Sequence, residues 1–67
     1  MYLYAIEWQS ENKGTGTYYV KASTIEIAKE HFAYMFDIND MEIVDIFQTT
    51  MEQIPANPYK KYISTAH

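Results

Sequence analysis

The sequence contains no cysteine, and all five of its basic residues are lysines. Without cysteine the chain can form no disulfide and offers no thiolate to a metal. Without arginine, and with a net charge of −4, it lacks the cationic face that displaces counterions from nucleic-acid phosphates. We therefore expect no direct binding to nucleic acid, and an acidic body that suits a basic partner surface.

Long apolar runs are also missing. No stretch approaches the roughly 20 apolar residues of a membrane-spanning helix, and no basic segment precedes an apolar one at the start of the chain. These features predict a cytoplasmic protein without a membrane segment. The 67 residues are expected to form one domain, with residues 1–54 as its body and residues 55–67 as a proline-containing C-terminal segment.

Aromatic and β-branched residues are abundant, and they mark three strands. Residues 2–9, 17–22 and 41–48 are rich in these types and contain neither glycine nor proline. Residues 10–16 form a turn cluster with two glycines, longer than a tight hairpin requires. Both alternating sides of residues 2–9 are mostly apolar, which favours a central position in a sheet.

Residues 23–36 predict the only long helix, around which the other elements are arranged. Ser23 and Glu26 fit the capping-box pattern, in which each side chain satisfies an orphan backbone N–H. Apolar residues at helical spacing then predict the face that packs on the sheet. These residues are Ile25, Ala28, Phe32, Met35 and Phe36.

The element order predicts an α+β fold with a mostly antiparallel sheet in the strand order 2-1-3 and the helix on one face. A short fourth strand would extend the sheet. Residues 49–54 fit either a longer third strand or a helical turn, and residues 59–63 fit an edge strand, a strap or a tail. The residues expected to face the helix are Tyr4, Ile6, Trp8, Tyr18, Val20, Val44 and Ile46. A slip of one residue in register would exchange the two faces.

One helix can cover only one face of such a sheet. The opposite face is expected to carry Leu3, Ala5, Glu7, Tyr19, Lys21, Ile43, Asp45 and Phe47. An apolar patch of this kind is rarely left exposed without a use. Residues 59–63, a second copy of the chain or a different partner could cover it, with Tyr19 and Phe47 as aromatic anchors.

No residue pattern indicates catalysis. Ser23 is explained as a helix cap, and His31 and His67 have no neighbours at metal-ligand spacing. The two glycines of residues 14–16 lack the lysine and following helix of a phosphate-binding loop. Asp45 is the one carboxylate flanked by apolar residues, and we expect it to point outward into solvent. The sequence therefore predicts no catalytic residue, no metal, no cofactor and no enzyme.

An acidic series follows the outer side of the helix into the third strand. It consists of Glu26, Glu30, Asp37, Asp40, Glu42 and Asp45. Carboxylates spaced at several ångström can imitate a phosphate backbone and occupy a cationic groove, whereas a solvated helix face is the alternative explanation. Together with Glu7, Tyr19 and Phe47, these residues are the predicted partner-binding set.

The junction of residues 20–29, with Ala22, Ser23 and Thr24 at its centre, leads from a strand into an amphipathic helix. With the β-β-α-β order and the small size, it resembles, over roughly residues 2–48, small phage-encoded inhibitor proteins. The phage inhibitor of bacterial host RNA polymerase and certain small anti-CRISPR proteins have this layout. The anti-CRISPR members that use basic faces on DNA differ from this acidic chain. The resemblance implies a non-enzymatic protein that blocks a host nucleic-acid machine, and it carries over no catalytic residue.

These observations predict a small acidic inhibitor that acts in the cytoplasm of a bacterial host. Its partner would be a host protein with a basic surface, such as RNA polymerase, a nucleoid protein or a CRISPR effector, bound with nucleic-acid mimicry as one mode. The alternative is a homodimeric structural or assembly protein that uses the uncovered sheet face for self-association.

Overall fold

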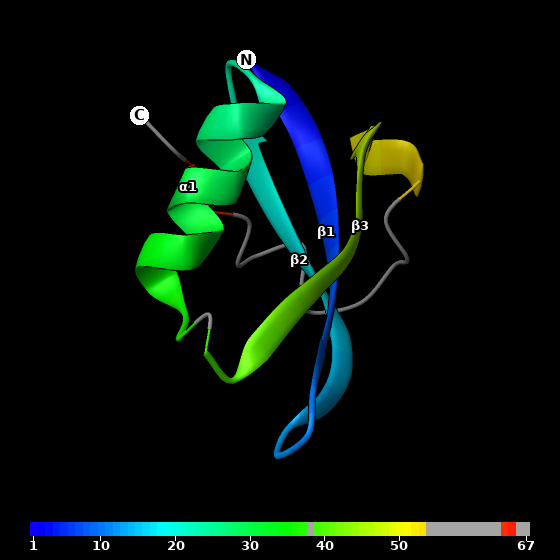
Figure 1. The fold of residues 1–67 in the computed structure, drawn as a ribbon. Coiled ribbons are helices and arrows are strands. Elements are labelled where there is room, and N and C mark those ends of the chain that lie inside the picture. The colour runs from blue at the N-terminus through cyan, green and yellow to red at the C-terminus, as the bar shows by residue number, and fades with distance from the viewer. Residues whose placement is uncertain (38, 54–63, 66–67) are drawn as a thin grey trace.

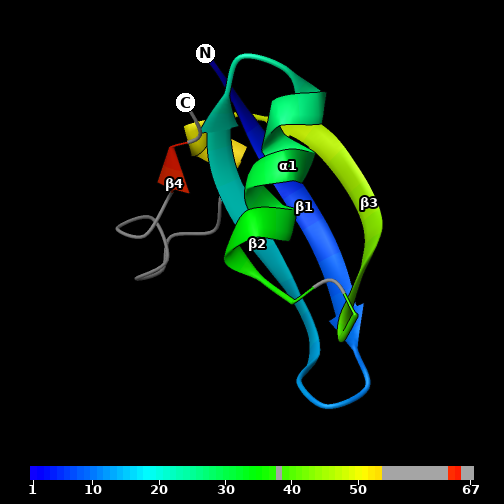
Figure 2. The same cartoon turned by 60° about the vertical axis from the view of Figure 1, so that its left-hand side comes forward.

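The computed structural model describes residues 1–37, 39–53 and 64–65 of the chain. The elements are β1 (Tyr2–Ser10), β2 (Gly14–Ala22), α1 (Ile25–Met35), β3 (Met41–Thr49), the 3₁₀ turn η1 (Met51–Gln53) and β4 (Ser64–Thr65). The sheet order is β3-β1-β2-β4, and α1 covers one face of the sheet (Figures 1 and 2). The predicted α+β fold, with the first strand in the centre and the order 2-1-3, is confirmed.

The central strand β1 is antiparallel to both of its neighbours, whereas the short β4 pairs parallel to β2 at Val20 and Lys21. The fourth strand therefore exists, but its described residues are Ser64 and Thr65. The predicted edge strand, strap or tail at residues 59–63 lies outside the described residues. At the end of β3, the chain turns into η1, so the helical alternative for residues 49–54 is the correct one for Met51–Gln53.

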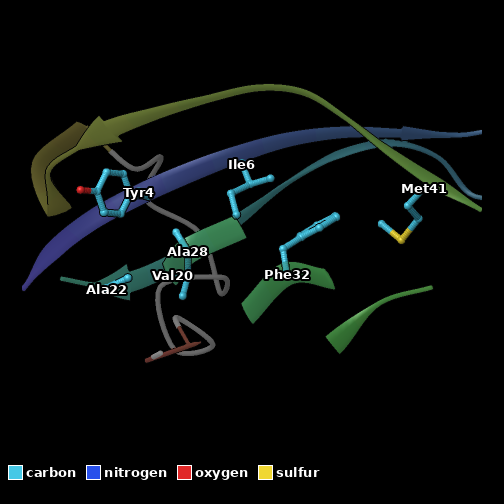
Figure 3. Close-up of a cluster of buried hydrophobic side chains, with 7 residues drawn as sticks. All are labelled: Tyr4, Ile6, Val20, Ala22, Ala28, Phe32 and Met41. Atoms are coloured by element: carbon cyan, nitrogen blue, oxygen red, sulfur yellow. The ribbon is translucent and has the colours of Figure 1, made fainter. Parts of the chain in front are cut away.

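The core lies between α1 and the face of the sheet that α1 covers (Figure 3). Its buried members are Tyr4, Ile6, Val20, Ala22, Ala28, Phe32 and Met41. Phe32 is fully buried, and its ring centroid lies 4.9 Å from that of Phe36 and 5.9 Å from that of Tyr18. This aromatic packing fixes α1 over β2, because Tyr18 belongs to β2 and both phenylalanines belong to α1 or its end.

A β-bulge in β3 changes which residues face the helix. Glu7 lies opposite Asp45, but the next residue, Trp8, lies opposite Ile43, so Val44 is the extra residue of β3. An extra residue interrupts the alternation of sides along a strand. The prediction that Val44 packs under the helix is therefore wrong, because Val44 is 60% exposed and Ile43 packs against the core in its place.

The helix is shorter than predicted at its N-terminal end. Thr24 is the N-cap, and its Oγ1 accepts a hydrogen bond from the backbone N–H of Ile27 at 3.2 Å. The predicted capping box that begins at Ser23 is thus wrong by one residue, because Ser23 and Thr24 are both residues with good capping side chains. Met35 was predicted to lie in the core but is 53% exposed, whereas Phe36, the next residue, packs against the core as predicted.

The hairpin between β1 and β2 is tighter than expected. The strands leave only Glu11–Lys13 as a loop, and the backbone N–H groups of Asn12 and Lys13 donate to the Oγ of Ser10 at 3.2 and 3.1 Å. Gly14 then takes a φ of +88°, a conformation that glycine adopts without steric cost. A three-residue loop followed by a glycine in this conformation is a common hairpin geometry.

Candidate protein-binding surface

We call the side of the sheet that faces away from α1 the open face. Because side chains alternate along a strand, residues between those of the core point to this face. They are Leu3, Ala5, Glu7 and Gln9 of β1, Thr15, Thr17, Tyr19 and Lys21 of β2, and Glu42, Asp45, Phe47 and Thr49 of β3. The prediction that Leu3, Ala5, Glu7, Tyr19, Lys21, Asp45 and Phe47 share a face is confirmed, and only Ile43 belongs to the other side.

Two aromatic residues flank the centre of the open face. Tyr19 and Phe47 lie on either side of Ala5 in the register of the three strands. Ala5 is only 2% exposed and Leu3 8%, so the central strand contributes less accessible apolar surface than the sequence suggested. Phe47 is 43% exposed and Tyr19 is half-buried. Accessible apolar surface is therefore concentrated toward β3.

The carboxylates of the open face gather at the hairpin end of the sheet. Glu7 and Asp45 are directly opposite each other on β1 and β3, and both are exposed. Glu42 follows across the bulge, where its Oε2 accepts a hydrogen bond from Nε2 of Gln9 at 2.8 Å. Among the described residues of this face, Lys21 is the one cation, and it lies at the far end of the strands. The face is therefore acidic at one end and aromatic at its centre.

A hollow of about 320 Å³ opens beside Glu7. Its lining residues include Gln9 of β1, Val44 of β3, and Thr15 and Thr17 of β2. Val44 was not predicted from the sequence to be a surface residue, because no sequence signal marks the bulge that exposes it. The hollow combines a carboxylate, hydroxyl groups and an exposed apolar side chain, which suits a basic side chain with a long apolar stem.

A second hollow, of about 590 Å³, lies at the hairpin tip between the β1–β2 turn and the start of β3. Glu11, Asp40 and Glu42 are among its lining residues. The carboxylate of Asp40 is already engaged, since its Oδ1 accepts from Nδ2 of Asn12 at 2.9 Å and its Oδ2 lies 3.8 Å from Nζ of Lys13. These contacts hold the hairpin against the segment before β3, so the role of Asp40 in this hollow is structural.

The predicted acidic series does not form one continuous stripe. Glu26 and Glu30 are exposed on α1, whereas Glu42 and Asp45 point from β3 to the opposite side of the sheet. Asp37 and Asp40 lie in the turn between these elements, where Asp37 Oδ1 accepts a hydrogen bond from the backbone N–H of Asn39 at 3.0 Å. The reason for the division is the sheet itself, which separates the helix layer from the open face.

The partner-binding set is likewise divided. The structure brings Glu7, Glu42, Asp45, Tyr19 and Phe47 together on the open face. It leaves the two helix carboxylates on the other side of the molecule. The members on the open face are the ones that combine charge with exposed or half-buried aromatic surface, which is the composition of protein interfaces.

His31, considered above as a metal ligand, packs against Tyr18 of β2. The two rings stack with centroids 6.1 Å apart, and Nε2 of His31 lies 3.1 Å from the hydroxyl of Tyr18. Both residues are partly buried at the flank of α1. His67 lies outside the described residues. Within the described part of the chain, no group of three histidine, cysteine or acidic side chains is arranged to hold a metal ion.

The described helices are all too short or too polar to cross a membrane. No protein-family model matches the sequence, and no curated protein or solved structure matches it either. The geometry of the open face is therefore the basis on which a function can be inferred for this chain.

Proposed function

We propose that this chain is a small non-enzymatic inhibitor whose open face binds a cationic surface of a bacterial nucleic-acid-handling protein. One observation carries the proposal: three carboxylates, those of Glu7, Glu42 and Asp45, share one sheet face with Tyr19 and Phe47. The resemblance to small phage inhibitors in element order and size supports the bacterial part of this proposal. RNA polymerase, a nucleoid protein and a CRISPR effector remain the candidate partners.

The two parts of the face have different tasks in this proposal. The carboxylates attract a basic surface over a distance and raise the rate of encounter, an effect that weakens as salt rises. The aromatic side chains then supply the buried contact that holds the complex together. Phe47 is suited to that task because it is exposed before binding, so its burial in the complex releases water from apolar surface.

Nucleic-acid mimicry is one mode of such binding. Directly opposite residues in an antiparallel pair have Cβ atoms about 5 Å apart, so Glu7 and Asp45 place two negative charges side by side. A cationic groove that accepts phosphates would accept these carboxylates for the same electrostatic reason. In this mode, the protein and the nucleic acid compete for one site on the partner.

The proposal is tested by capture from bacterial lysate on immobilised protein at low salt, with the retained proteins identified by mass spectrometry. The test variant is the double substitution Glu7→Lys and Asp45→Lys on the open face. The matched control is Glu26→Lys and Glu30→Lys, which makes the same change of charge on the helix. We expect the test variant to lose a nucleic-acid-binding protein that the unmodified chain and the control both retain.

DNA added to the column should elute the same protein if the binding mode is mimicry. Two outcomes contradict the proposal. One is a retained protein that is indifferent to the open-face substitutions, and the other is a partner lost only with the helix substitutions. Either result would show that the partner binds a surface other than the open face.

A second candidate function is self-association into a structural homodimer. The exposed side chains of Val44 and Phe47 favour it, because both border the same edge of the sheet and together offer apolar surface. The net charge of −4 on each copy opposes it. Light scattering at micromolar concentration separates the candidates, since a monomer contradicts the dimer and a stable dimer at physiological salt supports it.

A further inference from the structure

Among the described strands, β3 forms the long outer edge of the sheet. In the strand order β3-β1-β2-β4, β3 has β1 on one side and no described strand on the other. Its nine residues contain no proline, glycine or lysine, the residues that often prevent another strand from pairing. An edge of this kind presents unpaired N–H and C=O groups that an incoming strand can bond.

The side chain of Asp45 hydrogen-bonds to a backbone group of this edge strand. The backbone N–H of Ile46 donates to Oδ1 of the neighbouring Asp45 at 2.9 Å. A side-chain carboxylate thus occupies a backbone donor of the edge strand, and its charge faces any strand that approaches. Gln48 lies two residues further along, so its N–H points to the same side as that of Ile46. These two donors are the positions at which an added strand would form its first bonds.

The charge of the edge selects the kind of strand. Glu42 and Asp45 belong to β3, and Glu7 lies across from Asp45 on the open face. A second copy would bring its own acidic β3 and a net charge of −4 to this edge. A basic segment would instead pair its side chains with the carboxylates. The outer edge of β2 is less suitable, because β2 has two glycines and no carboxylate and pairs with β4 at one end.

We propose that the outer edge of β3 accepts an extended basic segment of a partner as an added strand. On docking, the backbone of the incoming segment replaces Asp45 as the acceptor of the Ile46 N–H, and the freed carboxylate pairs with a lysine or arginine of that segment. Val44 and Phe47, both exposed, pack against its apolar side chains. This inference rests on the proposed function, because it specifies how the cationic partner is held.

The test uses three capped peptides of equal length as probes. The first alternates lysine and valine, the second has the same sequence with alternate backbone nitrogens methylated, and the third alternates glutamate and valine. Amide hydrogen exchange and chemical shifts are followed by NMR on the isotopically labelled full chain. We expect the lysine peptide to slow exchange at Ile46 and Gln48, and the glutamate peptide to leave both unchanged.

Backbone methylation removes several hydrogen bonds without changing the charge of the probe. We expect it to weaken binding by about tenfold or more, since each bond adds a modest net contribution. Asp45→Asn keeps an acceptor for the Ile46 N–H but loses the charge, so it should weaken binding of the lysine peptide about two- to fivefold. Glu26→Gln on α1 is the matched control and should leave binding unchanged.

Three results would overturn the inference, and each would support a different explanation of the binding surface. If the methylated peptide binds as well as the unmodified one, the open face binds cations without strand addition and the proposed function stands. If no peptide binds but lysate capture still depends on Glu7 and Asp45, strand addition is excluded and the proposed function still stands. If Ile46 and Gln48 are protected without peptide in a protein that scatters light as a dimer, the edge pairs with a second copy.

Discussion

Replacing Glu7 with glutamine should stabilise the protein, although it removes a side chain of the proposed binding surface. Glu7 and Asp45 lie directly opposite each other on β1 and β3, and both are exposed. Like charges in that position repel, and cross-strand pairs of this kind are worth about 0.2–1 kcal/mol. A chain of 67 residues has a total free energy of unfolding of about 3–10 kcal/mol, so the gain is a measurable fraction of it.

The expected increase in melting temperature is about 1–8 °C, from the usual shift per kcal/mol for a domain of this size. Thermal and urea unfolding followed by circular dichroism would measure it at low salt and again at about 1 M salt, where the screening length falls to about 3 Å. The gain should shrink at high salt because the repulsion is screened. It should also shrink in an Asp45→Asn background, because the opposing charge is then absent.

Glu26→Gln provides a matched control with the opposite sign. Glu26 lies in the first turn of α1, where a negative charge interacts favourably with the helix dipole by about 0.3–1 kcal/mol. Its replacement should therefore lower stability while Glu7→Gln raises it. The reasoning would be refuted if Glu7→Gln destabilised the protein, or if its effect were the same at both salt concentrations and in both Asp45 backgrounds.

Two further substitutions test the local structure. Gly16→Ala should destabilise the protein by about 1–3 kcal/mol, because the added Cβ would lie 2.5 Å from Cζ2 of Trp8. The loss of unfolding free energy should be smaller in a Trp8→Leu background. An equal loss in both backgrounds would contradict the clash. Thr24→Ala should cost about 0.5–2 kcal/mol of unfolding free energy in urea titrations, whereas Ser23→Ala should have little effect; the reverse order would show that Ser23 is the cap.

The sequence was sufficient for the arrangement of the elements. Apolar residues on both sides of residues 2–9 placed the first strand in the centre, and the apolar stripe of residues 25–36 identified the face of the helix that packs on the sheet. The period-two spacing of strand residues also correctly put Tyr19 and Phe47 on the face that points away from α1. These predictions succeeded because burial on a particular side requires a regular spacing of apolar residues, and that spacing is visible in the sequence.

Details that depend on a single residue were not predictable in the same way. The bulge at Val44 leaves no mark in a run of apolar residues, so the sides of β3 before Asp45 were exchanged. Ser23 and Thr24 are adjacent residues that can both cap a helix, and the backbone geometry decides between them. The turn at Glu11–Lys13 was tighter than expected because the strands continue into residues that are usually found in loops.

The candidate site shows why charge along the sequence was a poor guide to charge in space. Glu26 and Glu30 are near Glu42 and Asp45 in the chain but lie in a different layer of the molecule. Glu7, far away in sequence, is the residue that lies opposite Asp45. A strand pairing brings charges together across many residues, and it can be inferred only after the sheet order and register are known.

Asp45 takes part both in the repulsion that lowers stability and in the proposed binding surface. It repels Glu7 across the strand pair, yet its Oδ1 accepts a hydrogen bond from the backbone N–H of Ile46 on the free edge. An aspartate that merely kept the edge soluble would serve equally well without a carboxylate opposite it. The carboxylate of Glu7 lowers stability but adds to the negative charge that the proposed basic strand would meet. In the proposed complex, the attraction for a cationic partner would therefore have the same origin as the repulsion in the free protein, and substitutions that relieve the repulsion should weaken the proposed binding.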